Sequence, residues 1–400
     1  MLANYLYINL PAEGHVNPTL GIVKELTARG EKVIYYCSEP FKARIEHAGA
    51  EFRRLDYGLD LSPKEKPPYA ILRMLERIED VVDSIYNDIQ QDNIDYVIYD
   101  ANALPGKIIG HLLKKPTIST WSIFAINEKM ADRLNALREK SKLNGLIDMD
   151  KLKKTLERLR DTYDMALPDF PKAMLCDGDL NIVFTSSFFQ MESATFPRNR
   201  YVFIGPSITS RTEQDQAFSV TFKPNQPLIY ASMGTVLNDQ PHFYQTVIQT
   251  FKNLPFNIIL SVGKNTAIES LGPIPDHIVV QQYVPQLKVL EQADVFVTHC
   301  GMNSTNEALY FNVPLVMLPA GSDQPIVADR VEELGAGVQL DLQTLTGEAL
   351  KNAVITVLND PKYRQSAKQI SASFREAGGY KKGVDAILRF TESYEAHLKI

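Results

Sequence analysis

The chain has 400 residues, 44% of them apolar and 22% charged, a length and balance that suit two globular domains of ordinary size. The formal net charge of -6 argues against nucleic acid as the main partner, because phosphate backbones are bound by basic surfaces. No apolar run could span a bilayer, the first residues lack the basic region of a signal peptide, and three scattered cysteines favour a reducing compartment, so we expect a cytoplasmic protein.

The first half of the chain alternates strand-like and helix-like segments. Short β-branched and aromatic runs predict strands, and apolar residues at helical spacing that end near glycine predict helices. In chain order we expect strand 2–10, helix 18–29, strand 32–37, helix 41–48, helix 69–91, strand 96–100, helix 108–113 and strand 117–120. Repeated units of this kind build a parallel sheet covered by helices.

A charged segment, residues 129–163, predicts a helical insertion over this sheet, after which strands return at 179–185 and 201–204. Residues 206–227 are polar and contain three prolines, so we expect a linker there and an N-terminal domain over residues 1–205.

The second half repeats the alternation and predicts a second domain over residues 228–380. Strands are expected at 228–232, 257–262, 278–284, 294–298 and 314–318, with helices at 244–251, 287–292, 303–311 and 326–334 and helical segments from there to the end. A C-terminal helix over 381–400 could pack back on the N-terminal domain. The overall expectation is two α/β domains in series, with a crevice between the carboxyl ends of their sheets.

The most informative segment runs from residue 282 to residue 337. A buried strand ends at His299, Gly301 gives room for close approach to the backbone, and a helix follows near Asn303 and Ser304, which are good N-cap types. The amides and positive dipole end of such a helix suit a pyrophosphate, and Glu307 could accept two hydrogen bonds from a ribose diol. Taken singly, His299 and Glu307 are better explained as ordinary structural residues; their combined spacing predicts a nucleotide site.

A second candidate site follows the first strand. Gly14 could form a tight turn that projects His15 into the crevice, and Asp100 ends the strand 96–100 at the same edge of the sheet. A histidine can remove the proton of an acceptor hydroxyl, and a carboxylate would orient the ring and stabilise its charge. From spacing alone, a catalytic pair and two capping residues explain His15 and Asp100 equally well.

The segment 282–337 resembles the nucleotide-sugar signature of the family 1 UDP-glycosyltransferases, especially the macrolide and small-molecule glycosyltransferases of Bacillus-type bacteria. The resemblance rests on Tyr283-Val284-Pro285-Gln286, His299-Cys300-Gly301-Met302-Asn303-Ser304, Glu307 and Asp323-Gln324. It implies a GT-B fold, with two Rossmann-like α/β domains facing each other across a cleft. It also implies inverting, metal-independent transfer of a hexose, with glucose favoured, from a UDP-sugar to a hydroxyl of a small lipophilic acceptor such as a macrolide or flavonoid. His15 would be the general base, supported by Asp100.

The resemblance also implies donor-binding roles. Tyr283 would stack on the uracil, Val284 would contact the base through its backbone, Gln286 would lie near the ribose and Glu307 would bind the ribose hydroxyls. The diphosphate would be held by Ser232, Gly234, Thr235, His299, Gly301, Asn303 and Ser304, and the donor sugar by Asp323 and Gln324.

The acceptor is expected on the N-terminal domain, against Ser119, Thr120, Trp121 and Phe124, although Phe124 is equally explained as core. Two Asp-x-Asp pairs, Asp148/Asp150 and Asp177/Asp179, are interpreted as surface turns or caps, so no metal and no cofactor are expected. The expected partners are therefore a UDP-sugar and a small acceptor, with the protein a monomer free of stable membrane association. A lipid glycosyltransferase at a membrane surface, a UDP-sugar epimerase and a nucleotide-sugar binder without turnover remain alternatives.

Overall fold

The computed structural model describes residues 2–58, 74–127, 130, 149–168, 175–209, 220, 222–236 and 238–398. The chain divides into two compact units, the first built from Met1–Thr209 and Ala377–Ile400 and the second from Ser210–Glu376. The second unit thus ends at 376 rather than at the expected 380. Ala377 and Gly378, the latter at a φ of 90°, separate helix α13 (Pro361–Glu376) from helix α14 (Gly379–Leu398). Of the expected linker 206–227, residues 210–219 and 221 lie outside the described residues.

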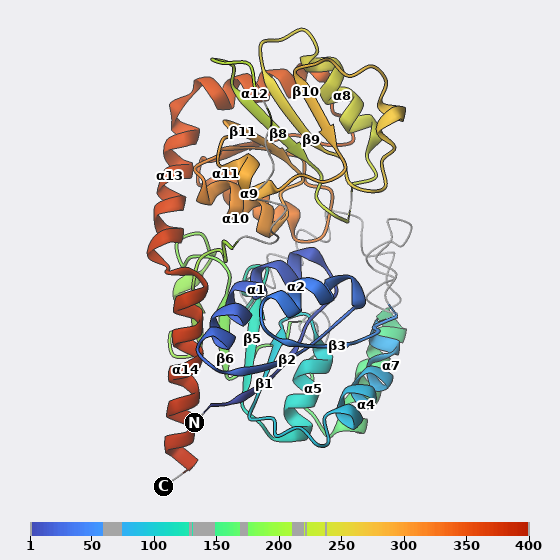
Figure 1. Ribbon diagram of the computed structural model, residues 1–400, viewed down its shortest axis with the longest axis vertical. Helices are drawn as coiled ribbons and strands as arrows, with labels where there is room; N and C mark the ends of the chain where they lie inside the picture. Colours follow the sequence, from blue (N-terminus) through green and yellow to red (C-terminus); the bar gives the residue numbers. More distant parts are fainter. Residues whose placement is uncertain are drawn as a thin grey trace. The chain divides into compact units, whose positions relative to one another are not determined.

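The first unit contains a seven-stranded sheet in which every paired strand is parallel (Figure 1). Its strands are β1 (Asn4–Ile8), β2 (Lys32–Cys37), β3 (Glu51–Arg54), β4 (Tyr96–Asp100), β5 (Thr117–Trp121), β6 (Leu180–Val183) and β7 (Tyr201–Phe203). Their order is β3-β2-β1-β4-β5-β6-β7, so the direction of winding reverses between β1 and β4. Such a reversal opens a crevice at the carboxyl ends of the strands.

Helices cover both faces of this sheet. One face carries α1 (Glu13–Ala28), η1 (Glu39–Phe41), α2 (Lys42–His47) and α14, and the other carries α4 (Ile78–Asp88), α5 (Leu104–Leu113) and α7 (Met149–Tyr163); η4 (Ser193–Thr195) precedes β7. Val384 and Ile387 of α14 are buried in one cluster with Val23 of α1, so the C-terminal helix packs on the first unit.

Of the expected insertion 129–163, residues 129 and 131–148 lie outside the described residues, and helix α7 accounts for residues 149–163. It packs beside α4 (Figure 1), and the ion pairs Lys151–Glu76 and Arg158–Glu79 join the segments. The charged face of α7 therefore points away from the apolar cluster that it shares with the sheet.

The second unit contains a six-stranded parallel sheet of order β10-β9-β8-β11-β12-β13. Its strands are β8 (Leu228–Ser232), β9 (Asn257–Ser261), β10 (Ile278–Gln281), β11 (Val295–Thr298), β12 (Leu315–Met317) and β13 (Gly337–Gln339). Its helices are α8 (Pro241–Phe251), η6 (Ile268–Leu271), α9 (Gln286–Leu290), α10 (Met302–Tyr310), α11 (Gln324–Glu333), α12 (Gly347–Asn359) and α13. Helices α8 and α12 share one apolar cluster with this sheet.

The central strands β2, β4 and β8 have the bounds that the sequence predicts. Every residue of β4 and β8 is buried, as is every residue of β2 except Lys32. Strands buried on both faces read as continuous apolar runs, and this makes them easy to find. The edge strands β3 and β13 were not predicted, the latter because residues after 334 were expected to be helical throughout.

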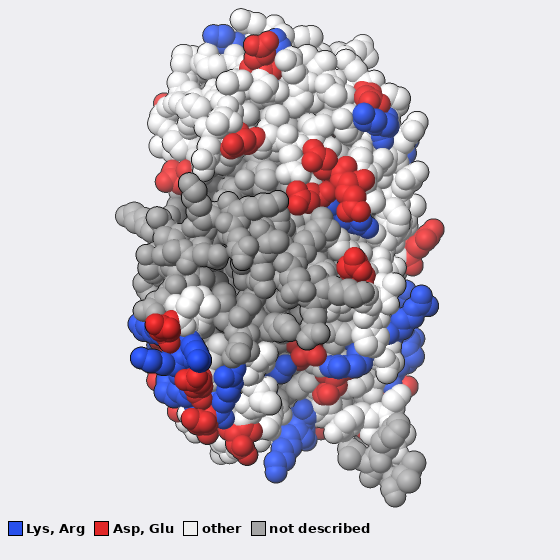
Figure 2. Space-filling view, turned by 180° about the vertical axis from the view of Figure 1, so that it is seen from behind, with Lys and Arg blue, Asp and Glu red and all other residues white. Residues whose placement is uncertain are grey.

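The surface carries both signs of charge. On the face shown in Figure 2, Lys and Arg side chains are interspersed with Asp and Glu over the part of the chain that is described. Among the helices of the described residues, none is long and apolar enough to cross a membrane.

Candidate active site

The register of the first sheet brings three strand ends together at the switch point. Strand β4 lies between β1 and β5, with Ile8 opposite Tyr99 and Asp100 opposite Thr120. The segments that follow β1 and β5 therefore meet the last residue of β4 at the carboxyl edge. Here His15 Nδ1 lies 2.8 Å from Asp100 Oδ2, so the structure brings together the two residues predicted to form the catalytic pair.

The local structure at His15 differs from the expected loop. Helix α1 begins at Glu13 rather than at Pro18, so Gly14 is a helical residue and His15 lies in the first turn. The backbone carbonyl of His15 accepts a hydrogen bond from Asn9 Nδ2 at 3.0 Å. Arg44 of α2 donates to both carboxylate oxygens of Glu13, at 2.7 and 2.8 Å. The turn that carries His15 is thus fixed from two sides.

Asp100 is 1% exposed and accepts from several donors. Its Oδ1 accepts from the backbone N–H of Asn102 at 2.8 Å, so Asp100 closes the turn after β4, but it does not cap the following helix α5, whose N-cap is Ala103. Its Oδ2 faces His15 Nδ1 and the hydroxyl of Ser122, the latter at 3.3 Å. Ser122 Oγ also lies 2.9 Å from His15 Nδ1. Because a carboxylate oxygen only accepts, Nδ1 carries the proton, and Nε2 is the ring nitrogen left to act as a base.

The residues predicted to contact the acceptor lie in the interior instead. Ser119 and Thr120 are fully buried, and their hydroxyls bond to Cys176 O and Tyr7 OH. Trp121 donates its indole N–H to Asn181, while Phe124 is 4% exposed and packs on the ring of Phe189. The expected acceptor contact of these four side chains stays a prediction. They alternate along a central strand and its continuation, where both faces are covered.

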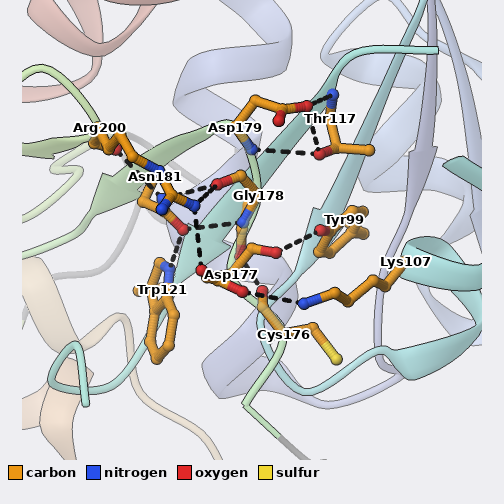
Figure 3. A network of polar contacts seen from close by, with 11 residues as sticks. Tyr99, Lys107, Thr117, Trp121, Cys176, Asp177, Gly178, Asp179, Asn181 and Arg200 are labelled. Carbon is orange, nitrogen blue, oxygen red and sulfur yellow. Dashed lines mark hydrogen bonds and ion pairs between the residues drawn. The ribbon is translucent and has the colours of Figure 1, made fainter. Parts of the chain in front are cut away.

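The carboxylates of Asp177 and Asp179 form hydrogen bonds and ion pairs with other residues of the protein (Figure 3). Asp177 accepts from Lys107 Nζ at 2.9 Å and from Arg200 at 3.0 Å. Asp179 accepts from the backbone N–H and the hydroxyl of Thr117, at 2.8 and 2.9 Å. These bonds match the interpretation as a structural turn. For the other pair, Asp148 lies outside the described residues. Within the described ranges, no group of three or more His, Cys, Asp or Glu side chains could hold a metal ion.

The second candidate site lies at the switch point of the second sheet, between β8 and β11. Ser232 at the end of β8 is opposite Thr298 at the end of β11, so the turn at Gly234 and the segment after His299 lie side by side. The φ of Gly234 is 76°, and a Cβ there would come within 2.5 Å of the His299 ring. A Cβ at Gly301 would come within 2.6 Å of the same ring. Glycine is therefore required at both positions, because a side chain at either one would collide with the His299 ring.

His299 is neutral in this setting. Burial lowers the pKa of its imidazole to about 4, and the backbone hydrogen bond with Ser232 offsets this only in part. Cys300, the next residue, is buried and adopts a φ of 65°, a left-handed conformation that is unfavourable for a side-chain-bearing residue. The chain is thus held in a strained turn directly before α10.

Helix α10 begins one residue earlier than the sequence predicts. Gly301 is its N-cap, without a side-chain cap hydrogen bond, and Asn303 and Ser304 lie in its first turn. The prediction that these two residues cap the helix is therefore wrong. The first-turn amides and the positive dipole end still lie next to His299, an arrangement that favours an anion.

Glu307 of α10 is 5% exposed and is held by Gln286 of α9. Gln286 Nε2 donates to Glu307 Oε2 at 2.6 Å and to Ser304 Oγ at 3.3 Å. On the other side of the amide, Tyr230 of β8 donates its hydroxyl hydrogen to Gln286 Oε1 at 3.2 Å. Gln286 and Glu307 therefore meet as the sequence suggested, but Gln286 is bonded within the protein.

The remaining donor residues lie around the same edge. Tyr283 is 61% exposed, which suits a stacking role, and Val284 is buried. Ser232 Oγ accepts from the Gly234 N–H, and Thr235 is exposed. Gln324, the first residue of α11, accepts from Ala320 N at 2.8 Å and Gly321 N at 3.2 Å, and Asp323 is the N-cap of the same helix. The ligand roles of these residues stay predictions.

Comparison with known proteins decides the family. Over 395 residues the chain is 38% identical to a Bacillus subtilis (strain 168) protein described as uncharacterized UDP-glucosyltransferase YojK, with 97% of each chain covered. It is 35% identical over 396 residues to the NDP-glycosyltransferase YjiC of the same organism, with 96% of each chain covered. The chain belongs to the family 1 glycosyltransferases.

The other comparisons agree with this membership. Residues 245–376 match the family described as Erythromycin biosynthesis protein CIII-like, C-terminal domain. The solved structure of the glycosyltransferase of kitacinnamycin superimposes with a TM-score of 0.84 at 26% identity, covering 97% of this chain and 98% of the other. The predicted family, the GT-B fold and the identity of the protein as a glycosyltransferase enzyme are confirmed.

Three residues of these sites were not found from the sequence of this glycosyltransferase. Ser122 directly follows Trp121, in the run where the sequence indicated an acceptor surface and not a partner of His15. Tyr230 reads as an ordinary apolar strand residue, and Asn9 as a strand end. Each acquires its partner through strand register, which no local pattern in the sequence contains.

Proposed function

We propose that this glycosyltransferase transfers a hexose from a UDP-sugar to a hydroxyl of a small lipophilic acceptor. We propose that the hexose is glucose, that its anomeric configuration is inverted, and that no metal ion is required. The observation that carries the proposal is the 2.8 Å contact between His15 Nδ1 and Asp100 Oδ2 at the switch point of the first sheet. Glucose is favoured by the description of a relative as a UDP-glucosyltransferase. A macrolide or flavonoid acceptor is the class implied by the family resemblance.

In this proposal His15 is the general base. The acceptor hydroxyl gives its proton to Nε2 as its oxygen attacks the anomeric carbon, and the bond between that carbon and the phosphate oxygen breaks. Asp100 keeps the ring in the Nδ1–H tautomer and stabilises the imidazolium that forms. One displacement at the anomeric carbon inverts its configuration.

The leaving UDP takes the bonding electron pair, and we propose that groups of the second unit stabilise its negative charge. The amides of the first turn of α10 and the dipole of that helix would stabilise it. Because these groups supply the electrostatic stabilisation that a divalent ion provides in other transferases, we propose that none is needed. Glu307 would hold the ribose hydroxyls.

Mass spectrometry of a reaction with UDP-glucose, a phenolic flavonoid and EDTA tests the proposal. A gain of one hexosyl unit, absent with His15→Ala, is expected, and the proton coupling at the anomeric carbon of the product should report the β-anomer. A product with retained configuration contradicts the mechanism, and a requirement for added metal contradicts the metal-independent step. If the wild-type protein does not bind UDP at all, the proposed function is wrong.

A further inference from the structure

We propose that Tyr230 is a positioning residue that selects the orientation of the Gln286 side-chain amide and thereby aligns Glu307 for the nucleotide. The inference rests on the proposed function, in which Glu307 binds the ribose. Tyr230 is a strand residue that is 1% exposed, and the side-chain amide of Gln286 links its hydroxyl to the Glu307 carboxylate.

Tyr230, Gln286 and Glu307 form a chain of hydrogen-bond donors and acceptors. Tyr230 donates to Gln286 Oε1 at 3.2 Å, and Gln286 Nε2 donates to Glu307 Oε2 at 2.6 Å. A carboxylate can only accept, so only the NH₂ side of the amide can face Glu307. The oxygen side must then face a donor, and the phenol is that donor.

The phenol is well suited to this task. Burial raises the pKa of Tyr230, so its hydroxyl stays protonated and can donate. Its ring is stacked on Phe296 of β11, with ring centroids 4.6 Å apart and planes 7° apart. The hydroxyl therefore comes from a rigid position on the central strands, whereas Gln286 lies at the start of the short helix α9.

Without the hydroxyl, Gln286 Oε1 loses its donor, and the bond from Nε2 to Glu307 alone holds the orientation of the amide. A Gln286 that rotates toward another donor would withdraw Nε2 from Glu307 or place its oxygen against the carboxylate, and two facing acceptors would displace the carboxylate. The apparent dissociation constant for a ligand increases in inverse proportion to the fraction of protein in the competent arrangement. If Glu307 is aligned in one molecule out of ten, UDP binding weakens about tenfold.

The test compares Tyr230→Phe with the wild-type protein by isothermal titration calorimetry with UDP and by initial rates with UDP-glucose. Phenylalanine keeps the ring and its stacking on Phe296, so the melting temperature should change little. We expect the dissociation constant for UDP and the KM for UDP-glucose to rise about tenfold while kcat stays within about twofold. Tyr363→Phe, a buried tyrosine of the same unit that takes no part in this set of contacts, is the matched control.

A second variant separates orientation of the amide from a general loss of packing. Glutamine at position 307 can both donate and accept, so in a Glu307→Gln background either orientation of Gln286 finds a partner. Adding Tyr230→Phe to that background should change the UDP affinity by less than about twofold. A tenfold effect that persists in Glu307→Gln overturns the proposal, because it would come from the core and not from the amide.

The remaining outcomes are equally informative. Wild-type affinity in Tyr230→Phe, with UDP binding intact in the wild-type protein, overturns the role of Tyr230 and leaves the proposed function standing. Failure of the wild-type protein to bind UDP overturns both. Loss of affinity in Tyr230→Phe that disappears in the Glu307→Gln background supports the proposal.

Discussion

Replacing Asp100 with asparagine should place the proton of His15 on the wrong ring nitrogen. The backbone N–H of Asn102 donates to Oδ1 at 2.8 Å, so the amide oxygen of an asparagine would keep that position and its NH₂ would face His15. The NH₂ group would then donate to Nδ1, and the proton would move to Nε2. The nitrogen that should accept the proton of the acceptor hydroxyl would then be protonated.

The size of the effect follows from this tautomer change. The substitution keeps the shape of the side chain, and Ser122 can still bond to the new amide, so folding and UDP binding should be unaffected. The nearest chemical precedent, an Asp-to-Asn change behind a catalytic histidine, lowers kcat by roughly 10⁴-fold, and we expect a loss of about 10³ to 10⁴ here. That corresponds to about 4 to 5.5 kcal/mol of transition-state stabilisation.

The assay measures initial rates of product formation at saturating UDP-glucose, with UDP affinity determined in parallel. Asp385→Asn in the same unit, which removes only the surface ion pair of Asp385 with Arg29, is the control and should retain wild-type kcat. An Asp100→Asn enzyme with kcat within about tenfold of wild type would refute the assignment of the tautomer, and with it the role of His15 as base.

Four further predictions concern the same two sites. His15→Ala should abolish transfer and leave the UDP dissociation constant unchanged; a retained rate would exclude His15 as the base. Ser122→Ala should lower kcat about threefold to tenfold through loss of a hydrogen bond to the pair, with Ser122→Thr as the rescue variant. Glu307→Ala should weaken UDP binding in calorimetry, whereas unchanged affinity would argue against ribose contact. The pKa of His299 in the folded protein is about 4, below its ordinary 6.5. Neutral His299 therefore contributes fully to the stability of the fold above pH 6.5, and this contribution is lost as the pH falls toward 4. The free energy of unfolding, measured with urea at pH 7.5 and at pH 4.5, should therefore differ between the two pH values by about 2 kcal/mol less in His299→Gln than in the wild-type protein.

Much of the fold could be predicted because the central strands are apolar along their whole length. Strands β2, β4 and β8 are buried on both faces, and their bounds could be read from the composition of the runs alone. The edge strands could not: β3 has the sequence EFRR and β13 has only three residues, so neither shows a buried run. They form strands because a neighbouring strand has backbone groups with which they can hydrogen-bond.

The ends of two helices also depended on tertiary structure. Gly14 and Pro18 made a loop the better prediction for residues 13–17, yet α1 begins at Glu13, where Arg44 and Asn9 fix its first turn. In the second unit, Asn303 and Ser304 have the composition of caps, but the strained turn at Cys300 places the start of α10 at Met302. Contacts from distant elements outweighed local preference in both cases.

The sequence by itself determined which residues end the central strands, and together with the family resemblance it predicted His15, Asp100, His299 and Glu307 as members of two sites. Only the tertiary structure decided which side chains support them. Strand register places Ser122 beside the pair of His15 and Asp100 and Tyr230 next to Gln286, and it buries Trp121 where an acceptor contact was expected. The physical reason is that apolar patterning is a local property of the chain, whereas a hydrogen-bond partner is set by which strands lie next to each other.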